Sequence, residues 1–183
     1  MTFVPLHFGH VGFAFSRSEI VIASAYFFPG QSFRRALTDA AARGVRVILL
    51  LQGRVEYVLL HYASRALYGA FLDAGIEIHE YHRSFMHAKV AVIDRHWSTV
   101  GSSNIDPFSL LLAREANVVI EDNGFAGQLR DSLLEAITGG AVQVRRESWG
   151  EQPLGVRVVT WLSYGVARLL TGLFAYGRAR EFT

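Results

Sequence analysis

Apolar and polar residues follow two periods along this chain, one typical of buried strands and one of amphipathic helices. Short apolar or alternating runs predict strands, whereas apolar positions three and four apart predict helices that end at Gly44 and Gly75. The predicted order is strand 19–27, helix 31–44, strand 45–51, helix 56–75, strand 76–81, a hairpin over 86–101, strand 115–120 and helix 124–137. This alternation predicts an α/β fold with a mixed β-sheet sandwiched by helices.

The segment 154–180 predicts a C-terminal amphipathic helix. Six of its residues, Arg157, Thr160, Tyr164, Arg168, Thr171 and Arg178, fall on one narrow helical stripe. Arg168 interrupts the apolar residues, whereas a membrane span needs about twenty in succession. We therefore predict a membrane-interfacial helix, with arginines at lipid phosphates and Trp161, Leu169 and Phe174 in the acyl boundary. Packing on the chain's own domain or on a partner subunit is the alternative.

Composition limits the class of protein. The chain has 183 residues, 51% of them hydrophobic, which is enough for one globular domain with its own core. We assign this domain to residues 19–140 and regard residues 1–18 as an irregular segment. The sequence has no cysteine, which excludes disulfides and thiol catalysis. The net charge of +2 indicates a mild preference for anionic partners, with six arginines against three glutamates after Ala141.

One stretch, 87–104, carries the chemistry. His87 and Lys89 are two residues apart on a predicted strand, so they are expected to project from the same face. Asp94 has the opposite parity and opens a turn, which favours a capping or orienting role over contact with a substrate. The returning strand brings Ser102 and Asn104 to the same end. Such a cluster suits an anion.

The pattern H-x-K, four residues, Asp, six residues, G-S-x-N resembles the HKD motif of the phospholipase D superfamily. It is filled by His87, Lys89, Asp94, Gly101, Ser102 and Asn104. The sequence from about Ile20 to Ile137 resembles the C-terminal half of bacterial cardiolipin synthases. The similar segments include AYFFPG, LLLQGRVEY and GSSNIDPFSLLLAREANVVI.

This resemblance implies the residues' roles. The catalytic set is His87, Lys89 and Asp94, with His87 as nucleophile or its acid partner and a phosphohistidine intermediate. Lys89, Ser102 and Asn104 would stabilise negative charge on the phosphate oxygens. Glu115 would hydrogen-bond the catalytic histidine, although an ordinary strand-start carboxylate is the alternative. The scheme requires no cofactor, and zinc or magnesium dependence is not expected.

The sequence holds one HKD motif, whereas cardiolipin synthases carry two. Either two chains pair as a homodimer, or a separate N-terminal half supplies the second motif. The leading hypothesis is a cardiolipin-synthase-like phosphatidyltransferase that uses phosphatidylglycerol at an anionic membrane surface, peripheral on the cytoplasmic side. A single-motif homodimeric phosphodiesterase or nuclease is the runner-up. It is disfavoured because the sequence shows no lysine-rich groove with interleaved aromatics, so a nucleic-acid partner is not expected. An inactive half-gene remnant is the third reading, favoured by the irregular residues 1–18.

The helix 56–75 and the loop after Gln52 could also take part. His61 and Tyr62 lie on this helix, and packing within the domain is the first reading for both. The functional alternative is that the helix and the loop line a lipid cleft.

Overall fold

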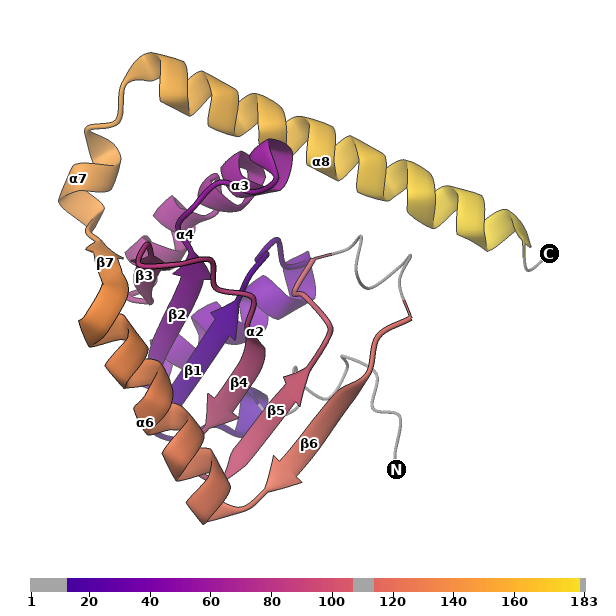
Figure 1. The fold of residues 1–183 in the computed structure, drawn as a ribbon. Helices are drawn as coiled ribbons and strands as arrows, with labels where there is room; N and C mark the ends of the chain where they lie inside the picture. The colour runs from indigo at the N-terminus through magenta and orange to yellow at the C-terminus, as the bar shows by residue number, and fades with distance from the viewer. Residues whose placement is uncertain (1–12, 107–113, 182–183) are drawn as a thin grey trace.

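The computed structural model describes residues 13–106 and 114–181. Within them, a seven-stranded sheet has the order β6-β5-β4-β1-β2-β3-β7 (Figure 1). Neighbouring β1, β2 and β3 run parallel and the other pairs antiparallel, which confirms the predicted mixed sheet. The strands are β1 (Glu19–Ser24), β2 (Arg46–Gln52), β3 (Glu77–Tyr81), β4 (Lys89–Ile93), β5 (Trp97–Gly101), β6 (Asn117–Glu121) and β7 (Ala141–Val144).

Helices cover both faces of the sheet, which confirms the predicted sandwich. They are α2 (Gln31–Ala42), α3 (Val58–Arg65), α4 (Tyr68–Asp73), α6 (Asn123–Gly140), α7 (Arg146–Gly150) and α8 (Leu154–Glu181). Alternate residues of a strand point to opposite faces. Ile20 and Ile22 of β1 pack on the side of α2, α3 and α4, whereas Val21 and Ala23 pack beneath α6. Because both faces are buried, the central strands read as unbroken apolar runs.

Two glycines end helices as the sequence predicts. Gly44 follows α2 with φ of +89°, and Gly75 follows α4 with φ of +80°. Both values lie in the left-handed region, which glycine adopts without the steric strain of a β-carbon.

The prediction of one helix over 56–75 is wrong, because the chain forms α3 and α4 with a break between them. The hydroxyl of Ser64 donates to the carbonyl of Leu60 at 2.7 Å. The amide of Leu67 bonds to Ser64, three residues back, at 3.0 Å. A side chain that bonds the helical carbonyls and a tighter turn after it interrupt the regular ladder.

The folded unit reaches beyond the predicted bounds 19–140. β7 pairs antiparallel with β3 and forms an edge of the sheet. Ahead of residue 19, residues 13–15 are helical. The Phe13 side chain is 2% exposed and packs edge-on against Phe33, with ring centroids 5.1 Å apart. The described part of the segment predicted to be irregular therefore contributes to the core.

α8 lies along α3 on the outside of the molecule (Figure 1). The threonines and the tyrosine of the polar stripe are turned inward: Thr160 and Thr171 are buried beside Ala167, and the rings of Tyr164 and Phe28 have centroids 5.7 Å apart. The two described arginines of the stripe, Arg157 and Arg168, are exposed. The apolar side is turned away from the domain and exposes Val158, Val159, Trp161, Leu162, Val166 and Leu169. The helix therefore packs on its own domain and still presents an apolar face outward.

The predicted lipid-facing residue Phe174 and the stripe residue Arg178 fall outside the described side chains of α8. Across the described ranges, the structure has no helix that is both long and apolar enough to cross a membrane.

Candidate active site

The predicted site residues other than Asp94 gather at one edge of the sheet, where several strands start or end. Ser24, the last residue of β1, pairs with Lys89, the first residue of β4. At the same edge, Ser24 also pairs with Leu51 near the end of β2. β5 ends here at Gly101, opposite Asn117 at the start of β6. This is the carboxyl edge of the parallel strands, where α/β proteins place their ligands.

His87 lies in the loop before β4, and its side chain is exposed. The predicted strand therefore starts too early, since β4 begins at Lys89, and a shared strand face does not position His87. The two residues are nevertheless neighbours: the Lys89 ammonium donates to the backbone carbonyl of His87 at 3.2 Å. The Tyr26 ring packs edge-on against the imidazole of His87, with centroids 6.3 Å apart.

Acidic side chains surround Lys89. Burial lowers the pKa of the Lys89 ammonium, and the carboxylates of Glu115, Glu56 and Asp106 oppose that shift. The net pKa is lowered, but three nearby carboxylates favour the charged form. Glu115 therefore lies in the electrostatic environment of Lys89, and its predicted hydrogen bond to His87 stays a prediction.

The Gly-Ser-Ser-Asn corner is fixed by bonds to β6. The amide of Ala116 donates to the Ser102 hydroxyl oxygen at 3.0 Å, and the Ser102 amide donates to the Ala116 carbonyl at 3.0 Å. Asn117 Nδ2 donates to the Ser103 hydroxyl at 2.7 Å. A β-carbon on Gly101 would lie 1.9 Å from Asn117 Oδ1, so the corner requires glycine. Asn104 follows and is half-buried.

Asp94 is not part of this cluster. It follows the last residue of β4, whereas Lys89 is the first, so the two lie about 16 Å apart at 3.3 Å per strand residue. The Asp94 carboxylate accepts the backbone amides of Arg17, Ser18 and Glu19 at 2.8, 2.8 and 3.0 Å. This geometry does not place Asp94 where it could act on a substrate. Its carboxylate instead holds the segment ahead of β1, as expected for an orienting residue in a turn.

Three residues near the predicted nucleophile were not predicted from the sequence. Tyr26 contacts His87, and its hydroxyl donates to the Glu56 carboxylate. Asp106 is 3% exposed, and its carboxylate, like that of Glu56, favours the charged form of Lys89. These residues come from three separate loops at the carboxyl edge of the sheet. Their position after strands that end at this edge could have identified them as site residues, since residues that follow parallel strands gather there.

The described residues include no group of three or more His, Asp or Glu side chains arranged to hold a metal ion. Lys89 places an ammonium at this edge of the sheet, near three carboxylates and the exposed His87. Such a set of groups can attack an electrophilic phosphorus and bind its oxygens.

Comparisons with known proteins agree on the family. Residues 13–137 match the family model described as cardiolipin synthase, PLD-like domain. Cardiolipin synthase B of Escherichia coli (strain K12) is 47% identical over 129 residues, which is 70% of this chain and 31% of the relative. The match thus spans about a third of the length of that curated relative.

Solved structures share the fold at low identity. The phospholipase D family member Nuc from Salmonella typhimurium has a TM-score of 0.64 and 19% identity, covering 76% of this chain and 90% of Nuc. Phosphatidylserine synthase from Haemophilus influenzae Rd KW20 has a TM-score of 0.70 and 12% identity, covering 88% of this chain and 43% of the synthase. From the family model and the 47% identity, the chain belongs to the phospholipase D superfamily, in its cardiolipin-synthase-like family.

Proposed function

We propose that this chain carries one half of a phosphatidyltransferase active site that exchanges phosphodiesters of phosphatidylglycerol. The observation that supports it most directly is that the exposed His87 lies beside the Lys89 ammonium, which donates to the His87 backbone carbonyl, at the carboxyl edge of the sheet. A nitrogen of His87 attacks phosphorus, glycerol leaves with a proton, and a phosphatidyl-histidine forms. A hydroxyl of a second phosphatidylglycerol then attacks that phosphorus and releases the histidine, which gives cardiolipin.

The proposed proton transfers need a second histidine. In the first step glycerol must gain a proton, and in the second the attacking hydroxyl must lose one, so the same group serves both. This sequence contains one H-x-K with the correctly spaced aspartate. We propose that the second motif comes from another copy of the chain or from a separate N-terminal half.

The roles of the charged residues follow from their positions. Charge grows on the phosphate oxygens in the transition state, and a fixed ammonium stabilises it more than it stabilises the ground state. Lys89 supplies that ammonium. Burial lowers the pKa of Lys89, and the nearby carboxylates of Glu115 and Glu56 favour its charged form against that shift. Ser102 and Asn104 add neutral donors at the same corner.

The nucleophile is tested with His87→Ala and Lys89→Ala on phosphatidylglycerol vesicles, using mass spectrometry of the lipid products. Both variants should lose turnover and keep the wild-type unfolding curve, because His87 is exposed and Lys89 is half-buried. His96→Ala is the matched control, since His96 is exposed in the hairpin turn and pairs with Asn123. Full activity in His87→Ala would refute the mechanism.

Mixing experiments test the source of the second motif. If homodimers supply it, exchange of wild type with an equal amount of His87→Ala should cut the activity of the wild-type protein to about half, because half of its subunits enter heterodimers. If a separate half supplies it, the chain alone is inactive and co-expression with that half restores turnover. A monomer that forms cardiolipin unaided would contradict the two-motif requirement.

We further propose that the outward face of α8 holds the protein at an anionic membrane surface. Trp161, Leu162 and Leu169 are 64, 65 and 64% exposed on that face. Arg157 and Arg168 are exposed along its border. This combination favours an interfacial position, with apolar side chains in the acyl boundary and guanidinium groups at phosphates.

Point substitutions are the suitable test, because truncation after Gly150 would remove the fully buried Ala167 and uncover Phe28. Leu162→Gln with Leu169→Gln should weaken sedimentation with phosphatidylglycerol vesicles by about tenfold or more, since each leucine buries apolar area worth about 1.5 kcal/mol or above. Val142→Gln, at a 62% exposed valine of β7, is the matched control. Unchanged vesicle binding in the double variant would exclude this face.

A further inference from the structure

Tyr26 lies just after β1, in a segment whose backbone is held on both sides. Ahead of it, the amide of Ala25 donates at 2.9 Å to the carbonyl of Ala88, the residue that follows His87. Behind it, Phe27 is 2% exposed and packs in the core beneath α2 and α4. The half-buried Tyr26 side chain is therefore fixed at its root, next to the segment that carries the proposed nucleophile.

The imidazole of His87 needs such a neighbour. His87 is exposed and lies in the loop before β4, so strand pairing does not hold it. An exposed side chain in a loop rotates between rotamers unless another group restricts it. The Tyr26 ring packs on the imidazole edge-on, with an angle of 80° between the two ring planes. This arrangement is one that aromatic pairs prefer.

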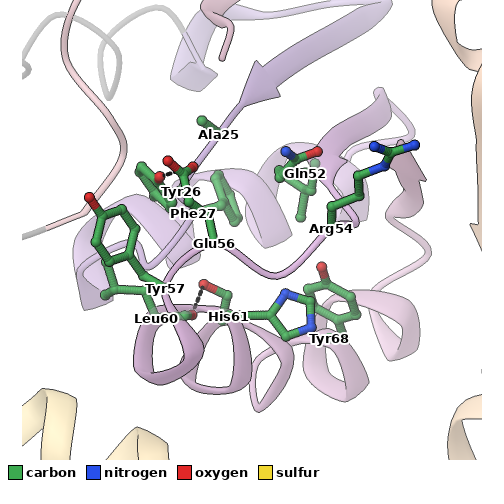
Figure 2. A pocket seen from close by; sticks show the side chains of 12 residues that line it. Ala25, Tyr26, Phe27, Gln52, Arg54, Glu56, Tyr57, Leu60, His61 and Tyr68 are labelled. Atoms are coloured by element: carbon green, nitrogen blue, oxygen red, sulfur yellow. Dashed lines mark hydrogen bonds between the residues drawn. The ribbon is translucent and has the colours of Figure 1, made fainter. Parts of the chain in front are cut away.

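The far end of the Tyr26 ring is anchored as well. Tyr26, Glu56 and Tyr57 line a small pocket between the end of β2 and α3, and the Tyr26 hydroxyl donates to the Glu56 carboxylate (Figure 2). The Tyr57 ring packs on Tyr26 with centroids 5.4 Å apart. Burial, followed by the hydrogen bond to Glu56, raises the pKa of Tyr26 above its usual value. The phenol thus stays protonated and keeps donating, which suits an anchor and not a proton carrier.

Glu56 connects this anchor with Lys89. Its carboxylate accepts from Tyr26 and favours the charged form of Lys89. The Lys89 ammonium in turn donates to the backbone carbonyl of His87 at 3.2 Å. These interactions form a closed circuit around His87. A nucleophile reacts efficiently only when it is aligned with the reacting atom, and such a circuit fixes the imidazole relative to the ammonium.

We propose that Tyr26 is a positioning residue for His87 and that Glu56 anchors it, so that the imidazole is held in the orientation for attack on phosphorus. The inference rests on the proposed function for the role of His87 as nucleophile. It adds two residues outside the HKD motif, one from the loop after β1 and one from the loop after β2. A purely structural Tyr26 would stabilise the fold and leave the orientation of His87 unchanged.

NMR of the full chain with isotope-labelled histidine measures the orientation without turnover. The His87 resonances are assigned by their absence in His87→Ala. The ring current of Tyr26 displaces the signals of the carbon-bound protons of His87. In Tyr26→Leu, which removes the ring, these signals should move toward those of an unconstrained histidine. In Tyr26→Phe, which keeps the ring, they should stay close to their wild-type positions.

A second pair of variants tests the anchor alone. Glu56 is exposed, so Glu56→Ala should keep the fold. It leaves the Tyr26 hydroxyl without its acceptor, and the His87 signals should move part of the way. Glu56→Gln should retain them, because its amide oxygen still accepts from the hydroxyl.

The effect on the reaction is measured with bis(4-nitrophenyl) phosphate, a soluble phosphodiester. Tyr26→Leu should lower kcat by up to about tenfold, which is the rate equivalent of an aromatic pair. KM should stay within about twofold, because Tyr26 acts through His87 and not on the substrate. Tyr26→Phe should keep kcat within about threefold of wild type, because the ring packing remains.

Tyr62→Leu is the matched control. Tyr62 is half-buried on α3, and its ring packs edge-on against a different histidine, His61, with centroids 5.3 Å apart. This variant should leave the His87 signals and kcat unchanged. Urea unfolding of Tyr26→Leu and Tyr62→Leu separates lost stability from lost orientation.

Three outcomes would overturn the inference: His87 signals that move in neither Tyr26→Leu nor Glu56→Ala, an intact kcat in Tyr26→Leu, or a raised KM at unchanged kcat. Failure of the proposed function is seen separately, as turnover that survives His87→Ala. In a chain that needs a separate half for turnover, the NMR comparison alone decides whether Tyr26 holds the imidazole.

Discussion

The Asp94 turn offers the sharpest test of which residues of the HKD motif serve catalysis and which stabilise the fold. Asp94 and Arg95 are the central residues of the β4–β5 hairpin, with φ values of +51° and +54°. The amide of His96 closes the turn on the carbonyl of Ile93 at 3.1 Å. Asp94 then binds the segment ahead of β1 through its carboxylate. We expect substitution of Asp94 to unfold this junction while leaving the distant His87 and Lys89 in place.

The magnitude follows from the bonds lost. Three backbone amides and the Ser18 hydroxyl donate to the carboxylate. Hydrogen bonds to a charged group contribute about 1.5–3 kcal/mol each when buried, and partial exposure of Asp94 reduces this to roughly 1 kcal/mol per amide. Asp94→Gly, which tolerates positive φ, should therefore cost about 3 kcal/mol, and Asp94→Ala about 1 kcal/mol more for the left-handed backbone. Arg95→Gly is the control and should be neutral or slightly stabilising.

Urea unfolding of the three variants measures these differences, and the pH dependence identifies their source. Burial raises the pKa of Asp94, but the amides of Glu19, Ser18 and Arg17 outweigh it and hold the pKa below its usual value. The stabilisation is therefore present above about pH 4 and is lost as the pH falls through the lowered pKa. A loss below 1 kcal/mol in Asp94→Gly would refute the reasoning. So would a fully stable Asp94→Asn that cannot turn over a soluble phosphodiester.

Three further predictions follow. His61→Gln should reduce the loss of stability between pH 6.5 and 4, because the lowered pKa of His61 lets only the unfolded chain bind the proton; after allowance for solvent screening we expect roughly 1–2 kcal/mol from urea unfolding at both pH values. Gly101→Ala should destabilise by about 1–3 kcal/mol through its clash with Asn117, whereas Gly127→Ala, with open space around it in α6, should stabilise by up to about 1 kcal/mol. EDTA should leave turnover of a soluble phosphodiester unchanged, since Lys89 occupies the role of a cation; loss of activity restored by one divalent ion would contradict this.

Local patterns predicted the framework well. The apolar runs of β1 and β2 are buried on both faces, so their hydrophobicity leaves no alternative to a central strand. Gly44 and Gly75 end helices because the left-handed backbone there favours glycine. The break at Ser64 escaped prediction because its cause is one hydroxyl bond within an otherwise amphipathic pattern. β7 was not predicted because its middle residues are exposed, so its sequence does not show the apolar pattern of a buried face.

The residues of the candidate site likewise fall into those that the sequence predicts and those that only the fold brings together. The spacing of His87, Lys89 and Asp94 is local and readable, and the opposite parity of Asp94 already indicated its separate role. Glu56 and Asp106 could not be assigned from spacing, because three-dimensional folding alone brings their loops to Lys89. The sequence likewise does not indicate that the amide of Gln52 lacks hydrogen-bond partners, since that depends on all the groups packed around it.

Periodicity also could not orient α8, because a stripe of polar residues can face water or a neighbouring helix. Here the short side chains of Thr160 and Thr171 allow close approach to the domain, which turns the leucines outward. Tyr164 rests on Phe28, whose amide donates to the carbonyl of Ile105 at 2.7 Å, next to the candidate phosphate corner. A membrane bound to the outer face of α8 would therefore lie close to the edge that carries His87. It follows that Leu162→Gln with Leu169→Gln should slow turnover of vesicle lipid and leave turnover of a soluble phosphodiester unchanged, and equal slowing of both would show that α8 acts on the fold instead.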